Sequence, residues 1–206
     1  VLVCDPAYPV HFNGVILAGA KIHSMPLWIE NNFLPDLSKI PVAVAKKAKI
    51  MFLNYPNNPT GACVEDPAFW KEAIRFCKKY KILLVSDNAY SEVTFGDYVA
   101  PSIFEFAGAK EVALEFHSFS KTFNMAGWRI GWVCGAKQLL YPLEKFKSFL
   151  DYGAPTFIQL GAVAALNGSQ QCVREQAGVY EKRMIKMVDG LNKIGWKTRQ
   201  TKGTMY

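Results

Sequence analysis

The sequence predicts an α/β protein: a three-layer α/β/α domain around a mostly parallel sheet, followed by the start of a small α+β domain. Short apolar runs of strand length alternate with amphipathic stretches of helical period. Each apolar run ends at a cluster of polar residues. Strands joined through helices in this order take right-handed crossovers and pair in parallel, and ligands of such sheets bind beyond the carboxyl ends of the strands.

Strands are predicted at residues 1–5, 50–53, 82–85 and 112–116. The last three end at the polar clusters 54–60, 86–88 and 117–121.

A helix is predicted at residues 67–79, between the second and third strands, because apolar side chains recur there at helical spacing. Asp66 is its predicted N-cap. We expect its basic residues to form a solvated face. These are Lys71, Arg75, Lys78, Lys79 and, just beyond, Lys81.

The C-terminal part is predicted to be mostly helical, with helices at 137–151, 156–167 and 174–194 and a short strand at 196–198. We place a domain boundary near Gly168, which divides the chain into a large domain, 1–168, and the start of a small domain, 169–206. The chain begins inside a predicted strand, and residues 203–206 are typical of the start of another. We therefore interpret it as a piece of a longer protein.

Composition and charge argue against several classes of protein. Half of the residues are hydrophobic and a fifth are charged, as in ordinary globular proteins. No apolar run approaches the roughly 18–20 residues of a membrane helix and no charged leader precedes residue 1, so we expect a cytoplasmic protein without a membrane partner. The net charge of +7 comes from scattered basic residues, which does not favour a nucleic-acid partner. The five cysteines lack CxxC spacing and nearby histidines, so we expect reduced, mostly buried thiols and no metal site.

The most informative motif surrounds Lys121, which directly follows an apolar run. The hydroxyls of Ser118, Ser120 and Thr122 surround it, and Arg129 lies eight residues further on. An amine that attacks a carbonyl must be deprotonated, and desolvation and the like charge of Arg129 both disfavour its ammonium form. Hydroxyls and a guanidinium group bind phosphate. The motif therefore indicates a site for a phosphorylated aldehyde; the alternative is a solvated surface lysine.

A second cluster follows the predicted strand 82–85. Asp87 stands at the end of an apolar run, where a carboxylate is costly to ionise unless it meets a cation. A protonated pyridine nitrogen would be such a cation, and the pair would keep the ring an electron sink. Tyr90 could direct its phenol at a hydroxyl of the same ring. The alternative is an N-cap aspartate with a core tyrosine.

Two rigid turns complete the set. In residues 54–61, two prolines fix the backbone and Gly61 permits a sharp turn, so that Asn58 is presented with its amide free to donate. In residues 5–9, Tyr8 stands in another rigid turn, where it could stack on a flat ring or pack in a core or interface.

Taken together in this order, these motifs resemble the class I and II aminotransferases, pyridoxal-phosphate enzymes of fold type I. The resemblance extends over nearly the whole chain. The motifs that carry it are Asp-Pro-x-Tyr-Pro, Asn-Asn-Pro-Thr-Gly, Asp-x-Ala-Tyr, Ser-x-Ser-Lys and Arg-x-Gly-Trp.

The resemblance implies that Lys121 forms a Schiff base with pyridoxal 5′-phosphate and moves a proton between the substrate and the cofactor. It implies that Asp87 pairs with the pyridine nitrogen and that Tyr90 and Asn58 bond the ring hydroxyl. The remaining cofactor-binding residues that it implies are Ser118 and Arg129 at the phosphate and Tyr8 against the ring face.

The resemblance also implies a reaction: transfer of an amino group between an amino acid and a 2-oxo acid such as 2-oxoglutarate, in a homodimer. Residues 31–37 and 101–121 look most like LL-diaminopimelate aminotransferases, and residues 124–129 look more like alanine and aspartate aminotransferases, so the amino donor stays open. The family pattern has an N-terminal segment and most of a small domain that this chain lacks. We therefore expect the 206 residues alone to bind the cofactor poorly and to turn over little substrate.

Two alternatives share parts of this pattern. A C–S β-lyase would use the same cofactor residues but would release pyruvate and ammonia. The aminotransferase-like sensor domain of a transcription regulator would carry a winged-helix segment upstream.

Overall fold

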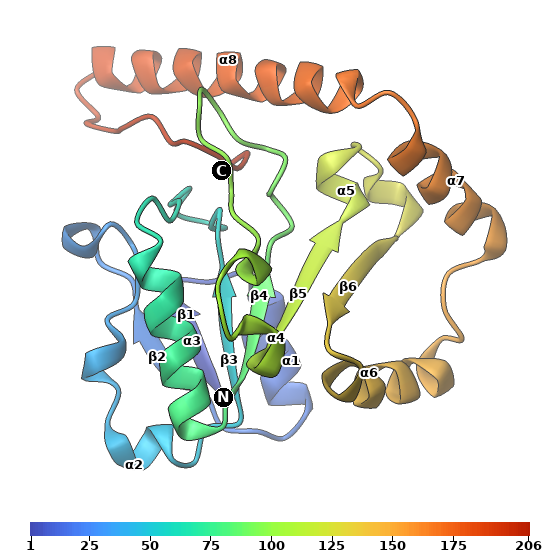
Figure 1. Cartoon of the computed structure of the whole chain (residues 1–206). Coiled ribbons are helices and arrows are strands. Elements are labelled where there is room, and N and C mark those ends of the chain that lie inside the picture. Colours follow the sequence, from blue (N-terminus) through green and yellow to red (C-terminus); the bar gives the residue numbers. More distant parts are fainter.

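The computed structural model describes residues 1–206 and contains a six-stranded sheet with helices on both faces (Figure 1). The spatial order of the strands is β2-β1-β3-β4-β5-β6. The first five strands pair in parallel and β6 is antiparallel to β5, so the predicted α/β class with a mostly parallel sheet is confirmed. The strands are β1 (Leu2–Asp5), β2 (His23–Pro26), β3 (Ile50–Asn54), β4 (Leu83–Asp87), β5 (Ala113–Ser118) and β6 (Gly131–Gly135).

The longer helices are α1 (Pro9–Leu17), α3 (Ala68–Tyr80), α6 (Lys137–Leu150), α7 (Thr156–Asn167) and α8 (Gln171–Lys193). Three single-turn helices, α2 (Val42–Ala45), α4 (Ala109–Val112) and α5 (Phe119–Thr122), lie between them. The 3₁₀ turns are η1 (Ile29–Asn31), η2 (Leu37–Lys39), η3 (Ile103–Glu105) and η4 (Ala126–Trp128). In Figure 1, α3 and α4 cover the near face of the sheet and α1 lies behind it.

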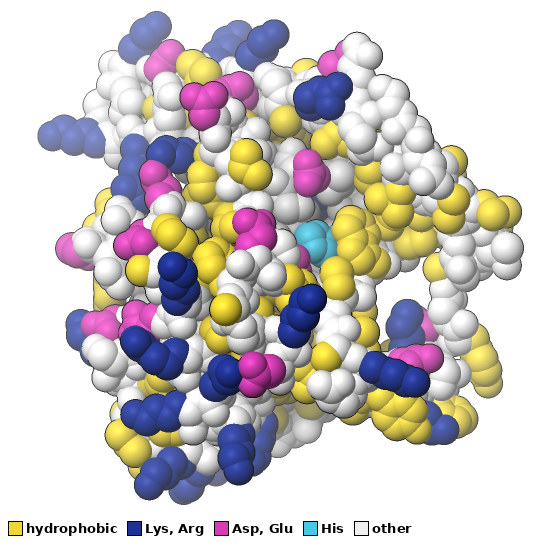
Figure 2. All heavy atoms as spheres, in the orientation of Figure 1, with side chains coloured by type: hydrophobic (Ala, Val, Ile, Leu, Met, Phe, Trp, Pro, Cys, Tyr) yellow, Lys and Arg dark blue, Asp and Glu magenta, His cyan; other side chains and the backbone are white.

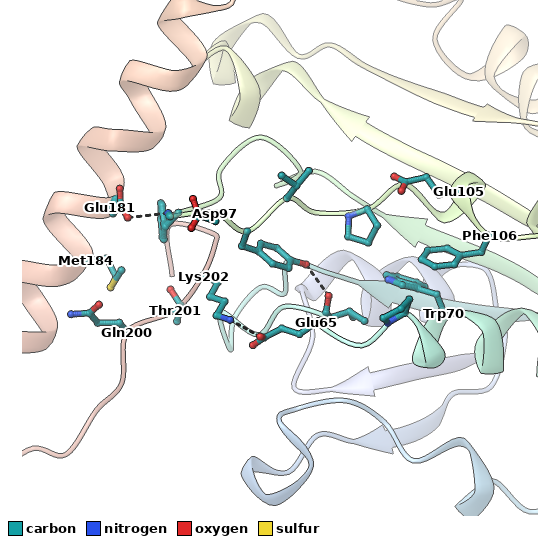
Figure 3. A pocket seen from close by; sticks show the side chains of 17 residues that line it. Glu65, Trp70, Asp97, Glu105, Phe106, Glu181, Met184, Gln200, Thr201 and Lys202 are labelled. Atoms are coloured by element: carbon teal, nitrogen blue, oxygen red, sulfur yellow. Dashed lines mark hydrogen bonds and ion pairs between the residues drawn. The ribbon is translucent and has the colours of Figure 1, made fainter.

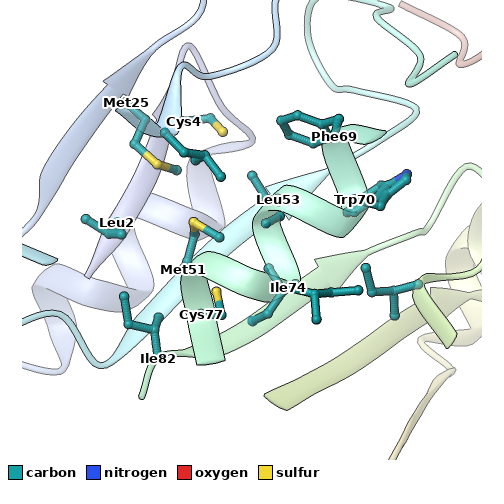
Figure 4. Packing of buried hydrophobic residues seen from close by; sticks show 14 of the residues in the cluster. Leu2, Cys4, Met25, Met51, Leu53, Phe69, Trp70, Ile74, Cys77 and Ile82 are labelled. Atoms are coloured by element: carbon teal, nitrogen blue, oxygen red, sulfur yellow. The ribbon is translucent and has the colours of Figure 1, made fainter. Parts of the chain in front are cut away.

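The main hydrophobic core fills the space between the sheet and α3 (Figure 4). Side chains alternate between the two faces of a strand, so Met51 and Leu53 of β3 and Leu84 of β4 point to the same side. They meet Trp70 and Ile74 of α3, and all five residues are almost fully buried. This packing fixes the positions of β3 and β4, whose carboxyl ends carry the polar clusters.

Helix α3 has the apolar and polar faces that its sequence predicts. The Asp66 carboxylate accepts a hydrogen bond of 2.8 Å from the Ala68 backbone N–H, which supports the predicted capping role. The helix ends at Lys81, whose left-handed backbone conformation (φ 56°) terminates it. Its basic residues are all exposed, as a solvated face requires.

Several details differ from the sequence-based predictions. Residues 196–198 form no strand, because their backbone is held instead by Asn192, whose side chain bonds both the N–H and the carbonyl group of Thr198. Residues 203–206 also form no strand, although Gly203 makes one isolated antiparallel bridge with Thr94. Of the five free cysteines, Cys4 and Cys77 are buried and Cys172 is exposed, so the thiols are less uniformly buried than expected.

A second, smaller cluster joins α8 and the C-terminal residues to the loop after β4. Tyr90, Val93 and Phe95 are buried there against Tyr180 and Met184 of α8. The Thr204 backbone N–H donates to the carbonyl oxygen of Val93 at 2.8 Å. The proposed boundary near Gly168 falls between α7 and α8 and stays a prediction. No helix of the protein is long and apolar enough to cross a membrane.

Candidate active site at the carboxyl ends of the strands

The residues predicted to carry chemistry lie at the same edge of the sheet. Asp87 is the last residue of β4 and Ser118 is the last residue of β5. Asn58 and Tyr8 follow β3 and β1, which end at this edge because these strands are parallel. Lys121 is in α5, which begins directly after β5. This edge is where ligands of parallel sheets bind.

The Asp87 carboxylate is held by a histidine that sequence reasoning missed. His11 Nε2 lies 3.0 Å from Asp87 Oδ2, and the two residues are 76 positions apart. The imidazole stacks on the Phe52 ring at 5.0 Å, and the Tyr8 ring meets it edge-on at 5.9 Å. The Asp87 side chain keeps 21% of its surface exposed, so one side of the carboxylate faces the edge of the site. The sequence held one indication of His11: it follows Tyr8 by three residues, which places both side chains on the same side of a helix.

Asn58 and Tyr90 are joined directly. Asn58 Nδ2 donates to the Tyr90 hydroxyl at 3.2 Å, and both residues are buried. Burial is the main reason why the pKa of Tyr90 lies above its usual range, and the hydrogen bond from Asn58 acts in the opposite direction. The phenol therefore stays protonated at neutral pH and can donate a hydrogen bond.

The loop that presents Asn58 is held by its own asparagines. Asn54 Oδ1 accepts the Asn58 backbone N–H at 2.8 Å, and Asn54 Nδ2 donates to the carbonyl oxygen of Asp87 at 2.8 Å. Asn57 Oδ1 accepts from the backbone N–H and the hydroxyl of Thr60. Gly61 has φ +69°, and a Cβ there would lie 2.4 Å from the Thr201 methyl group, so the turn needs glycine.

Lys121 points its amine at the same group of residues. Its Nζ lies 5.8 Å from the centre of the Tyr90 ring and forms no ion pair. The backbone carbonyl of Lys121 accepts a hydrogen bond of 2.6 Å from Gln176 Nε2 of α8. The lysine is therefore fixed through its backbone while its amine stays available.

Ser118 and Arg129 flank this lysine in the sequence: Ser118 is the last residue of β5, and Arg129 directly follows η4, before β6. Ser118 pairs with Gly131 of β6, and the Phe119 backbone N–H bonds the carbonyl oxygen of Ile130 at 3.3 Å. Arg129 is exposed, adopts a left-handed backbone (φ 53°), and donates from Nη1 to the Ala126 carbonyl at 3.0 Å. Its guanidinium group keeps further N–H donors for an anion.

A cleft of about 850 Å³ in the surface lies away from these residues (Figure 3). It separates Glu181 and Met184 of α8 from Glu105 and Phe106 at the end of η3. None of the predicted cofactor-binding residues lines it. The chemistry at the strand ends therefore has to be judged from the side chains there.

Comparison with known proteins agrees with this geometry. The family model for aminotransferase class I and II matches residues 1–206. The chain belongs to the class I and II aminotransferases. The predicted family resemblance is therefore confirmed.

This aminotransferase chain is similar to LL-diaminopimelate aminotransferases. It is 47% identical to the one from Moorella thermoacetica and 49% identical to one from Dehalococcoides mccartyi. Both matches cover 100% of this chain. They cover 52% of the Moorella relative and 53% of the Dehalococcoides relative. The chain thus spans about half the length of these relatives.

Solved structures have the same fold. BacF from Bacillus subtilis has a TM-score of 0.94 at 40% identity, with 99% of this chain and 52% of that chain covered. A probable N-succinyldiaminopimelate aminotransferase from Thermus thermophilus has a TM-score of 0.87 at 35% identity. The match covers 93% of this chain and 51% of that chain.

Proposed function

We propose that this aminotransferase chain forms the pyridoxal-phosphate site of an enzyme that moves an amino group from LL-diaminopimelate to a 2-oxo acid such as 2-oxoglutarate. The observation that carries the proposal is the convergence of three units at one edge of the sheet. These are the Asp87–His11 pair, the Tyr90–Asn58 pair and the amine of Lys121.

The residues at this edge suit the functional groups of the cofactor. Asp87 offers a carboxylate acceptor for a protonated ring nitrogen, and Tyr90 offers a donor for a ring hydroxyl. Ser118 and Arg129 offer donors for a phosphate. When bound, pyridoxal phosphate supplies an aldehyde that condenses with amines and a ring that draws electrons from the substrate α-carbon.

Each side chain has a definite task in this proposal. His11 Nε2 bonds Asp87 Oδ2 and so orients the carboxylate, whose other oxygen is free to accept from a protonated ring nitrogen. Asn58 orients the Tyr90 hydroxyl, and Tyr8 borders the ring face. Lys121 Nζ would hold the aldehyde of the cofactor and, as a free amine, would take the proton from the substrate α-carbon.

The choice of amino donor rests on the names of the most similar relatives. Their shared name, LL-diaminopimelate aminotransferase, supports that donor over alanine and aspartate. Because the chain spans about half of each relative, residues outside it also contribute to donor choice in our proposal.

Two measurements on the full-length protein test the proposal. Borohydride reduction after addition of pyridoxal phosphate, followed by peptide mass spectrometry, should place the cofactor on Lys121. Lys121→Ala should abolish this adduct and the activity, while Lys182→Ala on the exposed face of α8 should change neither. Product analysis with LL-diaminopimelate, alanine, aspartate and glutamate then identifies the donor. Release of pyruvate and ammonia without a new amino acid would instead show a β-lyase.

The proposal includes a homodimer in the cytoplasm. Its support is an exposed apolar surface on α6 and α7, where hydrophobic side chains gather (Figure 2). Exposed apolar surfaces of this kind commonly mark protein interfaces. These side chains are Tyr141, Phe146, Phe149 and Leu150 on α6, and Phe157, Leu160, Val163 and Leu166 on α7.

A further inference from the structure

Strand β5 contains a carboxylate that is almost completely buried and has no part in the proposed chemistry. Glu115 is 1% exposed. Its Oε1 accepts from the Ser102 hydroxyl at 2.8 Å and from His117 Nε2 at 3.0 Å. Its Oε2 accepts from the Ile103 backbone N–H at 2.7 Å and from the Ser86 hydroxyl at 3.4 Å. A buried charge is tolerated only with such a set of partners.

The partners keep the carboxylate ionised. Burial alone would raise the pKa of Glu115, but the hydrogen bonds from His117, Ile103 and Ser102 outweigh it and bring this pKa below its usual value. An ionised carboxylate only accepts hydrogen bonds, so His117 must carry its proton on Nε2. The orientation of the imidazole ring is thereby set by Glu115.

Two of these partners are direct neighbours of proposed cofactor ligands. Ser86 precedes Asp87 at the end of β4, and His117 precedes Ser118 at the end of β5. Ser86 and Glu115 are partners in the β4–β5 register. Because side chains alternate along a strand, Glu115, Ser86 and His117 lie on the face opposite to Asp87 and Ser118.

His117 extends the connection to β6. Its ring stacks on Trp132 at 4.6 Å with an angle of 7° between the planes, and the two residues are register partners. The backbones of β5 and β6 approach closely there, since a Cβ on Gly131 would lie 2.5 Å from the His117 carbonyl oxygen. Arg129 lies only two residues before Gly131.

We propose that Glu115 is a positioning residue, which acts through Ser86 and His117 to hold the ends of β4, β5 and β6 where Asp87, Ser118 and Arg129 can bind the cofactor. This inference rests on the proposed function. It assigns Glu115 no contact with the cofactor or the substrate.

The test compares Glu115→Gln with Glu105→Gln in the full-length protein. Glu105 is a matched control because its carboxylate accepts from the Ser102 backbone N–H at 2.8 Å, in the same turn, but contacts none of the strand ends. Glu115→Gln should weaken pyridoxal-phosphate binding roughly tenfold, as expected for the loss of one well-placed hydrogen bond, and Glu105→Gln should leave it unchanged.

Hydrogen exchange in the cofactor-free protein gives an independent readout. Glu115→Gln should speed exchange in peptides covering 86–90 and 117–132, whereas Glu105→Gln should affect only 101–106. Unchanged exchange at the strand ends would overturn the proposal. So would faster exchange with unchanged cofactor affinity, because the network would then be merely structural.

A second variant covers the case in which Glu115→Gln fails to fold. His117→Phe keeps a flat ring for the Trp132 stack but removes the hydrogen bond to Glu115. It should weaken cofactor binding roughly tenfold by itself, and unchanged affinity would contradict the proposal. If Glu115→Gln also folds, the double variant should lose less affinity than the sum of the single losses. An additive result would contradict the proposed connection. If the unsubstituted protein binds no pyridoxal phosphate, the proposed function fails, while hydrogen exchange still decides whether Glu115 holds the strand ends.

Discussion

At the scale of single residues, the contact between His11 and Asp87 fixes the carboxylate of the proposed site. It brings a helix after β1 against the end of β4, and it orients a carboxylate that would otherwise rotate freely. The stack on Phe52 and the edge contact with Tyr8 fix the imidazole in turn. The ring-nitrogen acceptor of the proposed site is therefore part of a buried aromatic arrangement.

We expect His11→Phe to keep the stack on Phe52 and to lose the hydrogen bond to Asp87. Binding of pyridoxal phosphate should weaken by about 3- to 10-fold, which corresponds to one net hydrogen bond of about 0.5–1.5 kcal/mol. Fluorescence titration of the full-length protein measures this, with His23→Phe in β2 as the control. Unchanged affinity in His11→Phe would show that Asp87 needs no orienting partner.

The lowered pKa of Glu115 predicts how stability depends on pH. Because its folded-state pKa lies below the usual value of 4.5, the ionised carboxylate stabilises the fold above about pH 4.5. This stabilisation is lost as the pH falls through the folded-state pKa. Glu115→Gln should therefore cost about 1–3 kcal/mol at pH 7 and progressively less in acid. Urea unfolding from pH 7 down to well below pH 4.5 measures the difference, and a gap that stays constant over this whole range would contradict the assignment.

At the scale of elements, the backbones of β5 and β6 approach closely at Gly131. Gly131→Ala would place a methyl group 2.5 Å from the His117 carbonyl oxygen, and backbone on both sides leaves little room to relax. We expect a loss of about 1–3 kcal/mol in the free energy of unfolding. The matched control is Gly190→Ala in α8, where a Cβ meets nothing within 4 Å.

The control should behave oppositely, because alanine is favoured over glycine in an exposed helix by about 0.5–1 kcal/mol. Urea unfolding of both variants gives the comparison. Equal effects of the two substitutions would mean that the close approach at Gly131 is not maintained in solution.

The elements that the sequence predicted well are those with strong local signals. Residues 156–167 are a helix with the predicted bounds, and β3, β4 and β5 lie within one or two residues of their predicted positions. β2 and β6 were not predicted. β2 lacks an apolar run, and β6 is defined by its pairing with β5, which the sequence alone does not show. The false strand at 196–198 shows the converse: Trp196 and Thr198 have strand character, but no neighbouring strand pairs with them.

The same distinction holds for the site. Lys121, Asp87 and Asn58 were found because each follows an apolar run in a recognisable motif. His11 and Glu115 were not found, because their meaning depends on partners that only folding brings near. His11 meets Asp87 across 76 positions, and Glu115 looks in the sequence like the single polar residue of an apolar strand.

At the scale of the whole molecule, the apolar surface of α6 and α7 stands out. Phe149 and Phe157 keep 71% and 70% of their surface exposed, and the neighbouring apolar side chains of both helices are exposed with them. Transferring such surface out of water stabilises an association by about 25 cal/mol per Å². We interpret this surface as the contact with a second copy of the protein.

The double variant Phe149→Glu/Phe157→Glu should therefore weaken dimerisation of the full-length protein at least tenfold. Sedimentation velocity over a range of concentrations measures the dissociation constant. Lys186→Glu on the polar side of α8 should leave it unchanged. A double variant that stays dimeric would show that other parts of the polypeptide cover α6 and α7.

The hydrogen bond from Gln176 to the backbone of Lys121 has a mechanical consequence. Helix α8 is 23 residues long, and near its start this contact of 2.6 Å reaches the short helix that carries the lysine. Further along, Tyr180 and Met184 of the same helix pack against the cluster that contains Tyr90. A tilt of α8 would therefore shift the amine and the phenol together, so their spacing is preserved while both change position relative to Asp87.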